Sequence, residues 1–129
     1  MVTYVSIGDV LAIHATLIHL YGGSDGVRDI GLVESALARP QAGFGGYDAY
    51  PTLFEKAAVL LRGIIKNHGF VDGNKRTGTA VMSIFIKLNS YKLIVTDSQL
   101  VSLAVKVAED KLDPEAITEW LNKHSKKIR

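Results

Sequence analysis

Two apolar segments that flank a short polar turn constrain the fold of this chain most strongly. Residues Leu53–Ile65 are apolar almost all the way round a helix, and residues Ala80–Leu88 are apolar again. A helix that is hydrophobic on every side has to be buried. Thr52 and Glu55 have the spacing of a capping box, which predicts that the first buried helix begins there and runs to about Lys66. The two segments therefore predict a central pair of packed helices.

The remainder of the chain also has the spacing of helices rather than strands. Apolar residues recur at helical intervals over 7–20, 30–38, 98–108 and 114–121. Each segment follows a residue that favours a helix N-cap, namely Ser6, Asp29, Asp97 and Asp113. About six helices and hardly any strand predict an all-α domain around the pair Leu53–Lys66 and Asn74–Leu88. We expect one domain over 1–129, in which 123–129 form a frayed basic tail.

The composition excludes several classes of protein. A net charge of +2, from 15 basic and 13 acidic residues, is too small to indicate nucleic-acid binding. The absence of cysteine excludes a disulfide scaffold and a thiolate nucleophile. No apolar run reaches the ~18 residues of a membrane span, and no basic segment precedes an apolar one at the N-terminus. We therefore expect a cytoplasmic protein with no membrane partner.

The turn between the buried helices holds an unusual density of polar groups. From His68 to Gly78 it contains a histidine, a carboxylate, an amide, two cations and three glycines. Such groups are costly to hold near a core unless they bind something. Asn74 favours a helix N-cap, so its helix start predicts an anion site to which Lys75 and Arg76 add two cations. Gly73 lets the backbone approach that ligand closely.

Two further side chains of the turn suggest a reaction. Asp72 is placed to hold a hard cation such as Mg²⁺, which usually takes one or two carboxylates together with phosphate oxygens. The alternative for Asp72 is to cap the following helix. His68 lies on the other side of the turn and can act as a general base. The turn thus predicts a phosphate-handling active site, although it lacks the first glycine of a Walker A loop.

The run His68-Gly69-Phe70-Val71-Asp72-Gly73-Asn74-Lys75-Arg76 resembles the H-x-F-x-D-x-N-K-R signature of the Fic/Doc family, and within it the death-on-curing branch of toxins. The resemblance extends over most of the chain, through Ala12-Ile13-His14, Tyr21-Gly22-Gly23, Gly26-Val27-Arg28-Asp29, 34–40, Tyr50-Pro51-Thr52, Lys66-Asn67-His68 and Trp120-Leu121. It implies the helical Fic fold, a catalytic His68, Mg²⁺ on Asp72, and ATP phosphates on Gly73, Asn74, Lys75 and Arg76.

The resemblance also implies a reaction and a target. Nucleotidyl-transferring members carry Gly-Asn-Gly-Arg and a second arginine three residues later, whereas this chain has Lys75 and Thr79 at those places. That difference implies phosphoryl transfer to a protein threonine or serine, with elongation factor Tu as the family's target and arrest of translation as the result. Adenylyl transfer remains open because Gly73-Asn74 also opens the nucleotidyl-transferase core. A helical domain that only binds RNA or a partner is the competing class.

Two further expectations concern partners. Many Fic proteins inhibit themselves through an [S/T]-x-x-x-E-[G/N] helix, which this sequence does not contain. The resemblance therefore implies a separate small antitoxin with a disordered segment that folds on binding. The glycines and aromatic residues of segment 41–50 suggest a mobile flap, and the resemblance implies that this flap docks the target's backbone as an added strand through Gly45, Gly46 and Tyr47. The alternative is a loop whose aromatics fill the core. Lys66 and Asn67, beside His68, are candidates for supporting the site.

Several residues outside the turn also have open roles. His14 and His19 are predicted to be core-edge or surface residues, with a place lining the site as the alternative. Arg28 is predicted to have a structural role, with phosphate binding as its alternative. Phe70 is predicted to bury its ring and so anchor the turn.

Overall fold

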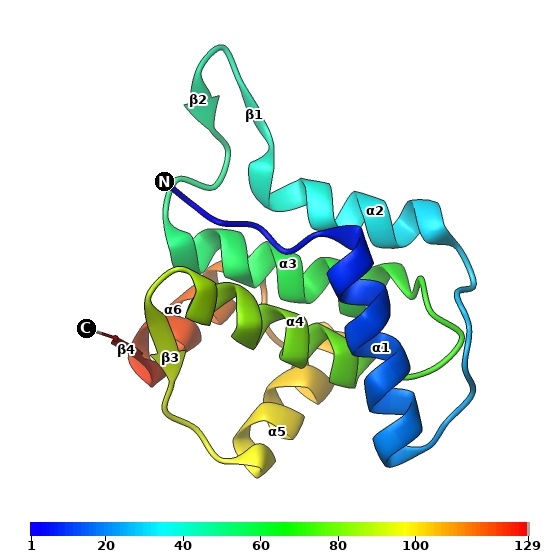
Figure 1. Cartoon of the computed structure of the whole chain (residues 1–129). Coiled ribbons are helices and arrows are strands. Elements are labelled where there is room, and N and C mark those ends of the chain that lie inside the picture. The colour runs from blue at the N-terminus through cyan, green and yellow to red at the C-terminus, as the bar shows by residue number, and fades with distance from the viewer. Residues whose placement is uncertain (129) are drawn as a thin grey trace.

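A computed structural model describes residues 1–128 of the chain. Six α-helices account for most of these residues, which confirms the all-α prediction, and two short two-stranded sheets accompany them (Figure 1). The elements are α1 (Ile7–Tyr21), α2 (Ile30–Ala38), a 3-10 turn (Arg39–Gln41), β1 (Gly43–Phe44), β2 (Tyr47–Asp48), α3 (Leu53–Asn67), α4 (Asn74–Leu88), β3 (Tyr91–Leu93), α5 (Asp97–Ala108), α6 (Pro114–His124) and β4 (Ser125–Lys127).

Helices α3 and α4 form the predicted central pair. The capping box is confirmed, because the Thr52 hydroxyl accepts from the N–H of Glu55 and the Glu55 carboxylate accepts from the N–H of Thr52. The two helices approach closely at Gly78, where a Cβ atom would lie 2.9 Å from Ile65. A larger residue there would require the Ile65 side chain to shift.

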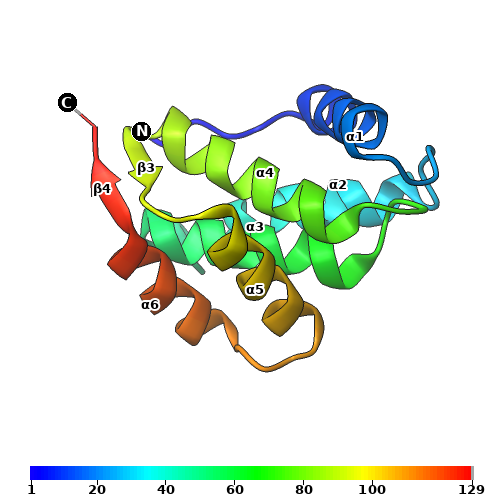
Figure 2. The same ribbon diagram turned by 90° about the horizontal axis from the view of Figure 1, so that it is seen from below.

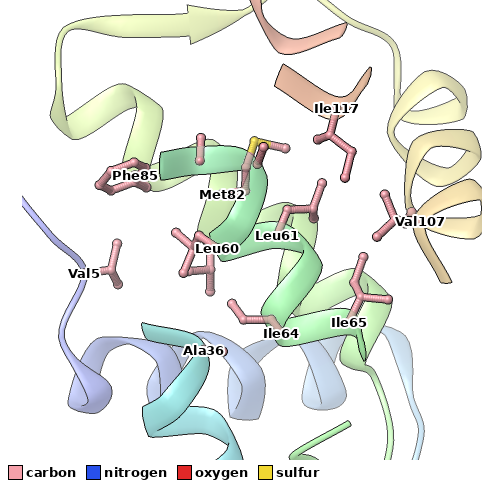
Figure 3. Packing of buried hydrophobic residues seen from close by; sticks show 14 of the residues in the cluster. Val5, Ala36, Leu60, Leu61, Ile64, Ile65, Met82, Phe85, Val107 and Ile117 are labelled. Atoms are coloured by element: carbon pink, nitrogen blue, oxygen red, sulfur yellow. The ribbon is translucent and has the colours of Figure 1, made fainter. Parts of the chain in front are cut away.

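The other helices surround this pair. Helices α2 and α6 contact α3, and α1 and α5 contact α4 (Figure 2). Their inward faces close around side chains of α3 and α4, of which Leu61, Ile64, Met82 and Phe85 are examples (Figure 3). The turn that joins α3 to α4 lies at one end of the bundle (Figure 1).

Most of the predicted helix starts are confirmed, and one cap is corrected. The side chains of Ser6, Asp29 and Asp113 each accept a backbone N–H in the first turn of their helix. For α5 the cap is Thr96 rather than Asp97. Thr96 exchanges two hydrogen bonds with Gln99, so a second capping box places Asp97 inside the helix.

The prediction of a frayed tail is wrong over residues 123–128. Helix α6 continues to His124, and β4 then pairs antiparallel with β3, with Lys92 opposite Lys126. The N–H of Ile128 donates to the carbonyl of Ser90, which extends the pairing beyond the strand. These hydrogen bonds pair backbone groups of a segment that its basic charge had suggested was solvated. Residue 129 lies outside the described part of the chain.

The segment 41–50 projects from the helical body as a β-hairpin (Figure 1). Gly45 and Gly46 both have positive φ, at 59° and 84°, which is the backbone of a two-residue type I′ turn. Phe44 is 91% exposed and Tyr47 is 82% exposed. The alternative in which these two aromatics fill the core is therefore wrong, and the hairpin presents them to solvent.

No helix within residues 1–128 has the length and apolar character that crossing a membrane requires.

Candidate active site

His68 ends α3 in the left-handed conformation, with φ 55° and ψ 46°. Arg28 supports this conformation, because its Nε donates to the carbonyl of His68 at 2.8 Å and its Nη2 to that of Asn67 at 3.2 Å. The predicted structural role of Arg28 is thus confirmed, although its partners are helix carbonyls rather than a carboxylate. Arg28 thus satisfies two carbonyls at the end of α3, and His68 is left exposed.

Asn74 does not act as the predicted N-cap. Gly73 occupies the cap position of α4, and the buried Asn74 side chain points back to Phe70. Its Oδ1 accepts from the N–H of Phe70 at 3.0 Å, and its Nδ2 donates to the carbonyl of Phe70 at 3.0 Å. The reason is geometric: a residue inside the first turn can bridge the preceding loop, which leaves the N–H groups of α4 free for another acceptor.

The same amide sets the tautomer of His68. Nδ2 of Asn74 lies 3.2 Å from Nδ1 of His68. An amide nitrogen only donates, so Nδ1 accepts and a neutral ring carries its proton on Nε2. In this tautomer the only free lone pair of the ring is on Nδ1, so His68 can accept a proton only when its contact with Asn74 is released.

The carboxylate of Asp72 is exposed but held by the backbone. Its Oδ2 accepts from the N–H of Ser24 at 3.1 Å, and its Oδ1 from the N–H of Gly73 at 2.8 Å. These two bonds, with smaller contributions from Lys75 and Arg76, lower the pKa of Asp72 below its ordinary value of 3.8. An N-cap side chain accepts from the second or third residue of its helix, and neither bond of Asp72 comes from those residues of α4. The alternative in which Asp72 caps α4 is therefore wrong.

The donor set around Asp72 fits a cation that is shared with a phosphate. Within residues 1–128 no group of three or more His, Asp or Glu side chains could hold a metal ion. Mg²⁺ commonly needs only one or two carboxylates when phosphate oxygens complete its shell. Asp72 keeps unused lone pairs on both oxygens and has Lys75 and Arg76 beside it, so the residues suit Mg²⁺ bound together with a nucleotide.

Lys75 and Arg76 lie exposed in the first turn of α4, which contains no acidic residue. The guanidinium of Arg76 sits 4.5 Å from the ring centre of Tyr21 on α1. Both cations border a groove of about 560 Å³ between α1, α4 and α5. Its apolar wall consists of Leu17, Ala80, Leu100, Val101, Ala104 and Val105.

The side chains of the other predicted supporting residues do not contact the turn in the described part of the chain. Lys66 donates to the carboxylate of Asp110 at 2.7 Å and to the carbonyl of Ala108, so it joins α3 to the end of α5. Asn67 donates to the carbonyl of Leu32 on α2. The tip of the exposed hairpin consists of Gly45, Gly46 and Tyr47. No described side chain of the turn makes a hydrogen bond to this tip.

Two buried residues have roles that the favoured sequence predictions did not include, although a place lining the site was the alternative for His14. His14 on α1 is only 3% exposed and contacts the turn directly, whereas the core edge or surface was the favoured prediction. Lys56 on α3 is 2% exposed and donates to the carbonyls of Pro40 and Tyr50 and to the Asp48 carboxylate, so it anchors the hairpin. Neither position carries a local sequence signal for such a partner. Phe70 is fully buried, which confirms its predicted anchoring role.

Residues 4–86 match the profile described as the Fic/DOC family, and this range contains the whole turn. The chain belongs to the Fic/DOC family. The relatives of this Fic/DOC chain include "Toxin Doc" from Mycolicibacterium smegmatis (strain ATCC 700084 / mc(2)155), 51% identical over 73 residues, which are 57% of this chain and 56% of that protein. "Protein kinase doc" of Escherichia phage P1 is 28% identical over 120 residues, 93% of this chain and 94% of that protein.

Proposed function

We propose that this Fic/DOC protein is the toxin of a toxin–antitoxin pair that transfers the γ-phosphoryl group of ATP to a threonine or serine of elongation factor Tu. The observation that carries the proposal is the arrangement at the start of α4. His68, Asp72, Lys75 and Arg76 are all exposed around one helix N-terminus, where backbone N–H groups are free. The names of the two relatives, a toxin and a protein kinase, support the same function.

Each group has a defined role in this transfer. The oxygen of the target hydroxyl attacks the γ-phosphorus, the bond from that phosphorus to the β–γ bridging oxygen breaks, and ADP leaves. The hydroxyl proton passes to His68. Lys75, Arg76 and the N-terminus of α4 neutralise the phosphate oxygens, and Asp72 would hold Mg²⁺, which supplies further neutralisation when bound.

The replacements at positions 75 and 79 favour phosphoryl over adenylyl transfer. Nucleotidyl-transferring members of the family have glycine and arginine there, by the resemblance described above. In this chain Lys75 adds a side chain beside the anion site, and the Thr79 hydroxyl donates to the carbonyl of Arg76. No cation at position 79 is therefore available to hold the terminal phosphates of a nucleotide bound in the adenylyl-transferring direction.

The reaction class is tested with radiolabelled ATP. The protein is incubated with elongation factor Tu and Mg²⁺, with γ-labelled and α-labelled ATP in parallel. We expect label on the factor from γ-labelled ATP only, and no label with His68→Ala. His19→Ala, which changes an exposed histidine of α1, is the matched control and should retain full transfer. Transfer of the α-label would establish adenylylation, and no transfer of either label would favour a binding function.

The groove between α1, α4 and α5 suits an antitoxin. Val101 is 64% exposed and Val105 is 37% exposed in its wall, which gives an apolar surface at helical spacing. An amphipathic helix laid there would bury these residues and cover Lys75 and Arg76 at the end of the groove. We propose that an antitoxin segment folds into this groove and blocks the phosphate site.

A pair of exposed variants tests the location. Val101→Asp places a charge in the groove, and Ile94→Asp places one at a position 55% exposed outside it. Each variant is expressed alone and with the neighbouring small reading frame. We expect Val101→Asp to remain toxic when co-expressed, whereas Ile94→Asp remains neutralised. Equal neutralisation of both would place the antitoxin elsewhere.

A further inference from the structure

The ring of His14 joins helix α1 directly to the turn. Its Nε2 lies 2.8 Å from the carbonyl oxygen of Asp72, 58 residues away in the chain. A carbonyl oxygen only accepts, so Nε2 of His14 carries the proton and donates it. This histidine is 3% exposed, which separates it from the solvent-facing side chains of the site.

The ring also packs against two other residues of the turn. It stacks on Phe70 with ring centres 3.9 Å apart and planes inclined by 10°. Gly73 is a close neighbour of the ring, since a Cβ atom added at Gly73 would come within 3.8 Å of Nε2. One imidazole therefore contacts the turn at Phe70 and at Asp72 and lies close to Gly73.

The remaining restraints on Asp72 come from less rigid neighbours. Its carboxylate is held by the N–H of Gly73, which is the adjacent residue, and by the N–H of Ser24, which belongs to an exposed loop. Helix α1, in contrast, is fixed to the bundle by buried Val10 and by its contacts with α4. A site supported from a helix keeps its geometry better than one supported from loops.

We propose that His14 is a positioning residue that fixes the peptide of Asp72 and thereby aims its carboxylate at the cation of the Mg²⁺–nucleotide complex. The inference rests on the proposed metal role of Asp72. Hydrogen-bond partners behind a metal ligand commonly change metal affinity or activity by about 10–100-fold when they are removed. His14 does this from behind, without touching substrate or cation.

Two substitutions separate the hydrogen bond from the packing. His14→Phe keeps a ring on Phe70 and loses the donor, whereas His14→Gln keeps an N–H donor of similar reach and loses the ring. Calorimetry measures ADP binding with Mg²⁺ and in EDTA, and Mn²⁺ binding in the presence of ADP is followed by electron paramagnetic resonance. Urea unfolding of each variant reports the fold separately.

We expect His14→Phe to weaken Mg²⁺-dependent ADP binding and Mn²⁺ binding about ten-fold or more. Its affinity for ADP in EDTA should be unchanged. His14→Gln should recover most of the lost affinity. Wild-type cation affinity in folded His14→Phe overturns the proposal, as does an equal loss in His14→Gln. Asp72→Asn distinguishes this from failure of the proposed function. If Asp72→Asn leaves the Mg²⁺ dependence intact, the metal role of Asp72 is wrong; if it abolishes that dependence while His14→Phe does not alter it, only the His14 inference is wrong.

Discussion

Replacing Asn74 by alanine should destabilise the protein as well as inactivate it. The Asn74 amide is 4% exposed and satisfies both the N–H and the carbonyl of Phe70, which is itself 1% exposed. Each buried backbone group left without a partner costs about 1–3 kcal/mol. Alanine regains at most about 0.7 kcal/mol of helix propensity. We therefore expect the free energy of unfolding to fall by about 1–5 kcal/mol, which is the cost of two unsatisfied groups less the gain in helix propensity.

Urea denaturation followed by circular dichroism measures this change, with the slope of the transition checked for a constant denatured state. Lys75→Ala is the matched control, because Lys75 is the next residue of the same turn and is exposed. Its unfolding free energy should stay within about 0.5 kcal/mol of wild type. A loss below about 1 kcal/mol in Asn74→Ala would refute the bracing role and leave Asn74 as a phosphate ligand only.

Three further predictions concern single groups. Folding lowers the pKa of Asp72, so its ionised carboxylate stabilises the protein above the ordinary pKa of 3.8. This stability is lost as the pH falls through the lowered pKa. Unfolding free energies measured between acid and neutral pH should show the loss in wild type and not in Asp72→Asn. Nitrogen NMR of the free protein should find the neutral His68 ring protonated on Nε2, and Asn74→Ala should shift that population toward Nδ1. Lys56→Met should accelerate amide hydrogen exchange in the hairpin 43–48 with little change in α4, since it removes the bonds that anchor the hairpin to α3.

Sequence patterns predicted the features that depend on local physics. The capping box of Thr52 and Glu55, the N-caps Ser6, Asp29 and Asp113, and the buried pair of helices all follow from interactions within one turn or one helix face. The hairpin had a local signal too, because Gly45-Gly46 between aromatic residues is typical of a two-residue turn. Its irregular composition indicated a flap but not strands.

Features that depend on distant pairing could not be predicted in this way. Strand β4 contains two lysines and pairs with β3, more than 30 residues earlier, so its charge indicated a solvated tail. The partners of Lys56, at Pro40, Asp48 and Tyr50, are set by how the hairpin returns to α3. The His14 contact likewise requires α1 to pack against the turn between α3 and α4, which no spacing within α1 specifies.

The turn combines two sets of residues with opposite energetic roles. Phe70 and Asn74 point inward and stabilise it, whereas Lys75 and Arg76 point outward at the N-terminus of α4. Cations at a helix N-terminus oppose the macrodipole, and this first turn has no acidic side chain to offset them. An unfavourable charge arrangement of this kind is expected where an anion is to be bound.

Reversing one of these charges should therefore stabilise the free protein while removing its function. Lys75 is the position to change, because Arg76 also packs on Tyr21 and its removal would mix two effects. We expect Lys75→Glu to raise the unfolding free energy by about 0.3–1 kcal/mol at low ionic strength, with the gain shrinking in high salt because exposed charges are screened. ADP with Mg²⁺ should raise the unfolding midpoint of wild type and not that of Lys75→Glu. A destabilised Lys75→Glu protein at low salt, or one still stabilised by the nucleotide, would contradict the view that this helix start keeps its cations for a phosphate.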